Sequence, residues 1–89
     1  MNGRSLLARN VRRIRVAKGI SQERLAYDSG IDRSYLGGIE REMENPTLDL
    51  LDRLAATLGV SLDELFIEPA GREERPAGLK RGRRRIRPM

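Results

Sequence analysis

Residues 19–39, GISQERLAYDSGIDRSYLGGI, predict two short helices joined by a tight turn. Ser21 is a suitable N-cap for the first helix, because its hydroxyl can accept a hydrogen bond from a free backbone N–H group. Gly30 can end that helix in the left-handed conformation, and Asp32 can cap the second helix only two residues later. Two helices joined so closely must cross at a steep angle, so the second one is directed outward.

This arrangement is the helix-turn-helix geometry, whose main known use is to place the second helix in the major groove of DNA. The residues inside the stretch fit it. Ala26 stands where the two helices are expected to cross, and its small side chain lets their backbones approach. Ile31 follows the turn and is expected to fill the core beneath it.

Composition limits the chain to one small domain of 89 residues. Only three aromatic residues are present, so the core must be aliphatic, which suits a helical bundle. The absence of histidine and cysteine removes the commonest general base and the commonest metal ligands. We therefore predict no catalytic residue, no metal site and no cofactor. No ligand pocket for a small molecule is evident, and no apolar run approaches the length of a membrane span.

Apolar spacing and capping residues predict an all-α, compact five-helix bundle over residues 1–69. The helices are expected over 5–18, 22–29, 33–41 and 48–58, with a fifth opened by a capping box at Ser61 and Glu64. Residues 70–89 are predicted to be a disordered basic tail. Residues 1–69 carry ten basic and eleven acidic side chains, a net charge of −1, whereas residues 70–89 carry eight and two, a net charge of +6.

Over residues 6–67 the chain resembles the Cro/C1-type helix-turn-helix family, the phage-repressor-like and XRE-like transcriptional regulators. The resemblance rests on G-I-S-Q-x-x-L-A-x-x-S-G-I-D-R-S-Y-L-x-x-I-E-R from residue 19 and on N-P-T-L-x-x-L-x-x-L-A-x-x-L-G-V-S-L-D-E-L-F from residue 45. Caps, core positions and turn residues match together, so the motif set is specific. The resemblance implies the lambda-repressor-like fold, with its helix-turn-helix over about residues 21–41.

The resemblance also implies a DNA-reading edge. It places Arg33 and Ser34 at base-contacting positions and Gly38 where the family often has a longer polar reader. Arg33 suits a bidentate pair with guanine, or it is a surface residue beside Asp32. Tyr35 either bonds a phosphate or covers the core edge. By resemblance Gln22 anchors a phosphate; the alternative is a solvated first-turn residue.

Two further features follow from the family pattern. It pairs Arg15 with Glu40 as a structural ion pair, which removes both from the list of DNA contacts. It usually has glycine where this chain has Glu42, so the helix from residue 33 is expected to run longer or end differently. Glu42 and Glu44 also repel phosphate, which indicates weak intrinsic DNA affinity or a loop that turns away.

Partner surfaces are predicted at both ends of the pattern. The basic tail is expected to add phosphate contacts without sequence choice, through Lys80, Arg81, Arg83, Arg84 and Arg85. A homodimer contact is expected at Leu50, Phe66 and Ile67, the alternative being that these residues complete the core.

The sequence thus predicts a non-catalytic, cytoplasmic, nucleoid-associated regulator that binds a palindromic DNA operator as a homodimer. It predicts no membrane partner. The alternative is an antitoxin-like or other protein-binding module whose tail binds a partner.

Overall fold

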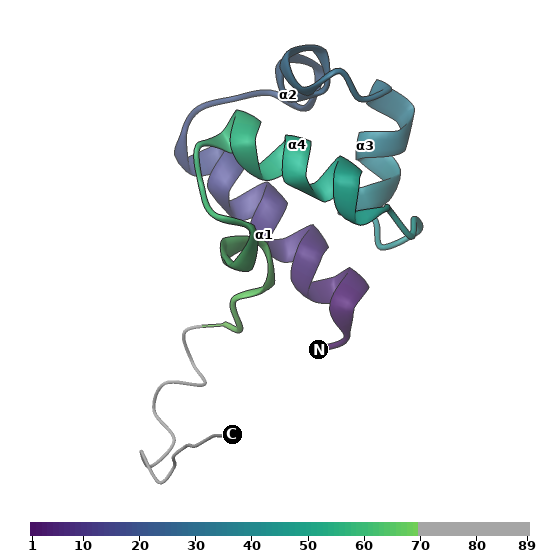
Figure 1. The fold of residues 1–89 in the computed structure, drawn as a ribbon, viewed down its shortest axis with the longest axis vertical. Coiled ribbons are helices and arrows are strands. Elements are labelled where there is room, and N and C mark those ends of the chain that lie inside the picture. Colours follow the sequence, from purple (N-terminus) through teal and green to yellow (C-terminus); the bar gives the residue numbers. More distant parts are fainter. Residues whose placement is uncertain (70–89) are drawn as a thin grey trace, which may run out of the picture.

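The computed structural model describes residues 1–69, so the predictions for the basic tail lie outside the described residues. It contains four α-helices followed by a short 3₁₀ helix, and the described part has no strand. These elements are α1 (Gly3–Ala17), α2 (Gln22–Ser29), α3 (Arg33–Glu40), α4 (Leu48–Leu58) and η1 (Leu62–Phe66). In Figure 1, α2 and α3 lie at one end of the molecule, above and beside α4. The predicted all-α fold is confirmed.

Each α-helix begins at a polar N-cap whose side-chain oxygen accepts a hydrogen bond from the backbone N–H three residues later. Ser21 and Asp32 cap α2 and α3 as predicted, and Thr47 caps α4. Asn2 caps α1, so this helix begins two residues before the expected start at Ser5. The capped N–H groups are otherwise unsatisfied at a helix start, so these residues fix where each helix begins.

The four α-helices also share one way of ending. In each, a residue with positive φ follows the last turn, and two backbone hydrogen bonds close back onto it as a Schellman motif. Glycine occupies that position after α1, α2 and α4, whereas Glu42, at φ 65°, occupies it after α3. The expectation that α3 would run longer or end differently is wrong: it ends at Glu40, and Glu42 adopts the glycine conformation.

The fifth helix begins differently from the prediction. Leu62–Phe66 forms a 3₁₀ helix, and Ser61 makes no capping hydrogen bond to its backbone. Instead, the Ser61 hydroxyl donates to the carboxylate of Asp63, so the predicted capping box with Glu64 does not form. Leu65 is nevertheless fully buried, because a single turn suffices to place it in the core.

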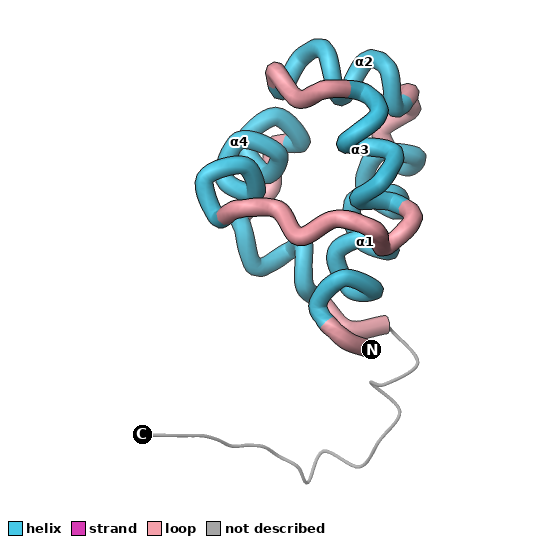
Figure 2. Tube along the Cα trace, turned by 90° about the vertical axis from the view of Figure 1, so that its right-hand side faces the viewer, coloured by secondary structure: helices cyan, strands magenta, loops and turns pink. Residues whose placement is uncertain are grey.

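The core takes one fully buried aliphatic side chain from every element. These are Val11, Leu25, Leu36, Leu54 and Leu65, each with 0% relative exposure. Burying a side chain of this size contributes roughly 1.5–3 kcal/mol. Figure 2 shows the elements gathered around this centre, with the loop of residues 41–47 running from α3 to the start of α4. The core therefore holds α3 against α1 and α2.

Asn10 joins the two ends of the described chain. It is fully buried in α1, and its Nδ2 donates to the carbonyls of Leu65 and Ile67 at 3.1 and 2.8 Å. Its Oδ1 accepts from the guanidinium groups of Arg9 and Arg13. Sequence periodicity did not single out this residue, because one polar side chain at a core position carries no signal of what it bonds.

Candidate nucleic-acid interface

α2 and α3 form the tight two-helix unit that the sequence predicted. Gly30 turns the chain at φ 72°, and the N–H of Ile31 bonds the carbonyl of Ala26 at 3.0 Å. Ala26 is 3% exposed and Ile31 is 6% exposed, so both fill the space beneath the turn. The backbone and the core thus hold α3 at a fixed angle to α2, with its outer face in solvent.

The first turn of α3 presents two exposed polar side chains, Arg33 and Ser34. Asp32 accepts a hydrogen bond from the backbone N–H of Tyr35 at 3.2 Å, so its carboxylate serves the helix cap. Tyr35 itself is half-buried and packs against the core, which is the structural role that the sequence left open for it. Arg33 and Ser34 are therefore the side chains of this turn that are open to a ligand.

A buried ion pair fixes α3 to α1. Arg15 Nε lies 2.8 Å from Glu40 Oε2 and Nη2 lies 3.0 Å from Oε1, while Nη1 donates to the Ile20 carbonyl at 2.8 Å. The side chains of Arg15 and Glu40 are 13% and 5% exposed. This two-pronged geometry is among the strongest that charged side chains form. The pair positions the helix and offers nothing to DNA.

Gln22 belongs to the same network. Its Nε2 donates to Glu40 Oε1 at 2.9 Å, which ties the start of α2 to the end of α3. Its Oε1 lies 3.8 Å from the position that a Cβ on Gly37 would occupy. Gln22 is therefore not the freely solvated residue of the alternative interpretation; it is held at the seam between the two helices.

Gly37 and Gly38 are both buried, although they lie on the outer side of α3. A Cβ on Gly37 would stand 3.1 Å from Arg41 Nη1, and one on Gly38 would stand 2.7 Å from Glu44 Oε2. The Glu44 side chain thus covers Gly38, and the Arg41 guanidinium covers Gly37. The close approach of these side chains gives a physical reason for the two glycines, and a DNA contact by Gly38 itself stays a prediction.

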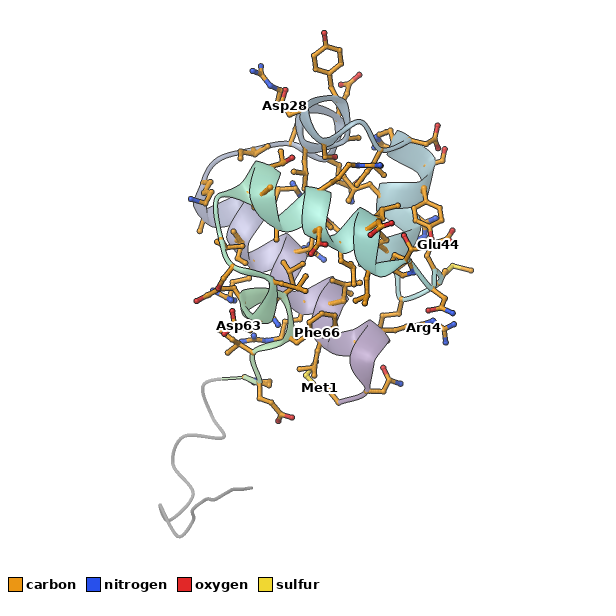
Figure 3. The ribbon with its side chains drawn as sticks, in the orientation of Figure 1. Met1, Arg4, Asp28, Glu44, Asp63 and Phe66 are labelled. Carbon is orange, nitrogen blue, oxygen red and sulfur yellow. The ribbon has the colours of Figure 1, made fainter. Side chains whose placement is uncertain are left out.

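The acidic loop after α3 does not turn away from the helix. The Ser5 hydroxyl donates to Glu42 Oε1 at 2.9 Å, and Arg4 Nε donates to the Glu44 carbonyl at 3.0 Å. Figure 3 shows Glu44 beside the C-terminal end of α3, with Arg4 below it on α1. These contacts tie the loop to the first turn of α1, while the Met43 N–H bonds the Gly38 carbonyl of α3.

The outer face of α2 carries a feature that the sequence interpretation did not use. Tyr27 is 83% exposed, and one turn away Arg24 pairs with Asp28 at 2.8 Å (Asp28 is labelled at the top of Figure 3). The hydrogen bond that Arg24 donates to the Asp28 carboxylate, and then the charge of that carboxylate, raise the pKa of Arg24 above its ordinary value. Arg24 therefore keeps its positive charge.

The residues predicted for a dimer contact divide into two groups. Leu50 and Phe66 are half-buried and pack against the core, whereas Ile67 is 39% exposed. Two apolar side chains that the prediction omitted are more exposed: Met43 at 68% and Leu48 at 69%. Leu48 stands on the first turn of α4, outside the core.

Within residues 1–69 the structure shows neither a cluster of three or more His, Cys, Asp or Glu side chains fit for a metal ion nor a helix fit to cross a membrane.

Comparison with known proteins identifies a family and several relatives that resemble this chain. A family profile described as helix-turn-helix (HTH_3) matches residues 11–65. A hypothetical transcription factor from Neisseria meningitidis serogroup B is 44% identical over 69 residues, covering 78% of this chain and 65% of that protein. Control protein C.SmaI from Serratia marcescens is 42% identical over 66 residues, covering 74% of this chain and 79% of that protein.

A solved structure agrees with these relatives. The restriction-modification controller protein C.AhdI from Aeromonas hydrophila has a TM-score of 0.69 at 44% identity, and the match covers 71% of this chain and 96% of that one. The chain spans just under two thirds of the length of the Neisseria protein. The matched region contains the capped α2–α3 unit, the core that holds it and the exposed start of α3. The chain therefore belongs to the Cro/C1-type, XRE-like helix-turn-helix family of DNA-binding transcriptional regulators.

Proposed function

We propose that this protein regulates transcription as a homodimer that binds a palindromic DNA operator, with α3 of each copy in a major groove. It acts by occupying the operator and performs no catalysis. The observation that carries the proposal is the exposed pair Arg33 and Ser34 at the start of α3, on a helix that the core and the Arg15–Glu40 pair hold rigidly. Base reading needs side chains fixed in this way on a firm support.

Each side chain of this edge has a chemical role in the proposal. The Arg33 guanidinium donates two hydrogen bonds to O6 and N7 of a guanine, and Ser34 bonds an adjacent base edge. Tyr35 turns its hydroxyl toward a phosphate while its ring stays against the core. Gln22 and the free N–H groups at the start of α2 face the phosphate backbone, with Gln22 held in place by Glu40.

The charge of the described residues shapes the affinity. Residues 1–69 carry a net charge of −1, so they attract the phosphate backbone weakly. We assign the missing electrostatic attraction to the basic residues among 80–85, which lie outside the described residues. This assignment separates the two tasks: α3 selects the sequence, and the basic segment raises affinity for every sequence.

A homodimer is part of the proposal because a single α3 covers only a few base pairs, whereas two copies together read a longer operator. We place the two-fold contact at the end of the described chain, where Ile67 is exposed beside the half-buried Phe66 (labelled in Figure 3), together with Leu50. Binding two adjacent half-sites requires the two reading helices to stand about 34 Å apart, one turn of B-DNA.

Electrophoretic mobility shift with a randomised double-stranded library tests the reading edge. Arg33→Ala is expected to lower affinity for the selected operator by ~10-fold or more and to relax the preference at one base pair of each half-site. Arg53→Ala, which removes the same charge from an exposed position on α4, is the matched control. Equal behaviour of the two variants on every sequence would remove Arg33 from the reading edge.

Analytical ultracentrifugation tests the dimer separately. We expect Ile67→Asp to shift the protein toward the monomer and to lower operator affinity, whereas Val16→Asp, at an exposed apolar position of α1, leaves the dimer intact. A wild-type protein that stays monomeric on its operator would refute the two-fold arrangement.

A further inference from the structure

The middle of the outer face of α3 is covered by side chains that come from outside that helix. Residues one helical turn apart lie on the same row, so Gly38 continues the row of Ser34, and Gly37 continues the row of Arg33. Where these rows would otherwise carry side chains, Glu44 lies over Gly38 and Arg41 lies over Gly37. On the outer face of α3, the exposed Arg33 and Ser34 are therefore followed by the Arg41 guanidinium and the Glu44 carboxylate.

The contact between Gly38 and Glu44 requires glycine. A Cβ on Gly38 would stand 2.7 Å from Glu44 Oε2 and 2.8 Å from its Cγ, distances at which the Glu44 side chain must move. Two adjacent glycines weaken a helix interior, so this helix gives up intrinsic stability where Glu44 and Arg41 come to rest. The absence of a side chain at Gly38 thus leaves the space that the Glu44 carboxylate occupies.

The backbone of Glu44 is held in place from two sides. Arg4 Nε donates to its carbonyl at 3.0 Å, and the preceding Met43 N–H bonds the Gly38 carbonyl at 2.8 Å. Glu42 supplies the left-handed turn that brings the chain back over α3. Within residues 1–69 the structure gives the Glu44 carboxylate no ion-pair partner, so its acceptor oxygens stay available on this face.

We propose that the Glu44 carboxylate reads a cytosine in the major groove, by accepting a hydrogen bond from its exocyclic N4 amino group. The inference rests on the proposed function, because it requires α3 to lie in the groove. A carboxylate only accepts hydrogen bonds, so it meets the amino group of cytosine favourably and repels the O6 of guanine and the O4 of thymine. The same charge disfavours binding to unrelated sequences, because there the repulsion between the carboxylate and the phosphates is not offset by a hydrogen bond from cytosine.

Two variants that disturb Glu44 in different ways test the inference in the full chain. Glu44→Gln removes the charge, and Gly38→Ala displaces the Glu44 side chain from its position over α3 while keeping the charge. Alanine favours the helix, so Gly38→Ala is expected to fold. Both variants are expected to lose preference at the same C·G base pair of each half-site, by ~10-fold or more, with preferences elsewhere unchanged.

Glu42→Gln is the matched control, because Glu42 has the same charge two residues away but directs its carboxylate to Ser5. We expect this variant to bind all sequences somewhat more tightly and to keep every base preference. The measurement is competitive binding at fixed salt against operators changed one base pair at a time. The inference is overturned if Glu44→Gln behaves as Glu42→Gln does, or if Gly38→Ala leaves the preferences of the wild type. A wild-type protein that selects no sequence would overturn the proposed function instead.

Discussion

Replacing Arg15 with alanine should remove most of the stability of the folded domain. The guanidinium makes two hydrogen bonds to Glu40 and one to the Ile20 carbonyl, at 2.8–3.0 Å. Without it, the Glu40 carboxylate, 5% exposed, keeps only the hydrogen bond from Gln22. Breaking a buried pair in this way costs about 3–5 kcal/mol, because the remaining charge is neither solvated nor paired.

That cost is large for a domain of this size. At typical values per residue, the whole free energy of unfolding of residues 1–69 is about 3–10 kcal/mol. Urea titration followed by far-UV circular dichroism measures the change. With an m value of about 1 kcal/mol per molar urea, the midpoint of Arg15→Ala should fall by about 3 M, or the variant should be largely unfolded without denaturant.

Arg24→Ala is the matched control, because Arg24 also forms an ion pair but lies in solvent, with 70% of its side chain exposed. Its urea midpoint should stay close to that of the wild type. The double variant Arg15→Met/Glu40→Leu should recover much of the stability, since it leaves no buried charge. If Arg15→Ala costs no more than Arg24→Ala, the pair does not hold α3 and the reasoning fails.

Three further predictions address other parts of the molecule. Glu42→Gly should raise the urea midpoint, because glycine relieves a left-handed conformation that costs other residues about 1–2 kcal/mol; a lower midpoint would show that the Ser5 hydrogen bond outweighs that strain. Asn10→Ala should lower the free energy of unfolding by about 2–4 kcal/mol in the same titration, because the Leu65 and Ile67 carbonyls lose their donor, and an unchanged value would contradict this role. A variant with glutamine at the five basic tail residues should show a shallower salt dependence of operator binding (Lys80, Arg81, Arg83, Arg84 and Arg85). The log–log slope, measured by titration at several salt concentrations, should fall by about 0.9 for each phosphate that is no longer neutralised. An unchanged slope would show that other residues neutralise the phosphates.

The sequence was most informative where structure depends on neighbouring residues. Ser21 and Asp32 were identified as caps because an N-cap acts on an N–H only three residues away. Gly30 was identified as a helix end because a left-handed residue closes only the turn directly before it. The bounds of α2 and α4, the all-α fold and the position of the helix-turn-helix all followed from such signals.

The errors lie where a side-chain contact in the folded protein overrides a local sequence pattern, or where nothing in the described residues covers an apolar position. The capping pattern at Ser61 predicted a helix, but its hydroxyl donates to Asp63 and only a 3₁₀ turn forms. Glu42 argued for a different end to α3, but packing of the following loop against α1 imposes the glycine conformation on it. Leu48 matched the apolar spacing of its helix, yet nothing in the described part of the chain covers its position at the first turn, and it is 69% exposed.

The candidate site shows the same division. By itself the sequence determined the two capped helices, the turn between them and Arg33 and Ser34 at the start of the second, because each depends on residues a few positions apart. Only the tertiary structure decided what covers the rest of that helix. Glu44 lies over Gly38, Gln22 bonds Glu40, and Asn10 bonds Leu65 and Ile67 because the folded core brings together segments that the chain keeps apart. Side-chain contacts of this kind depend on where the helices pack, and no local pattern of residues specifies them.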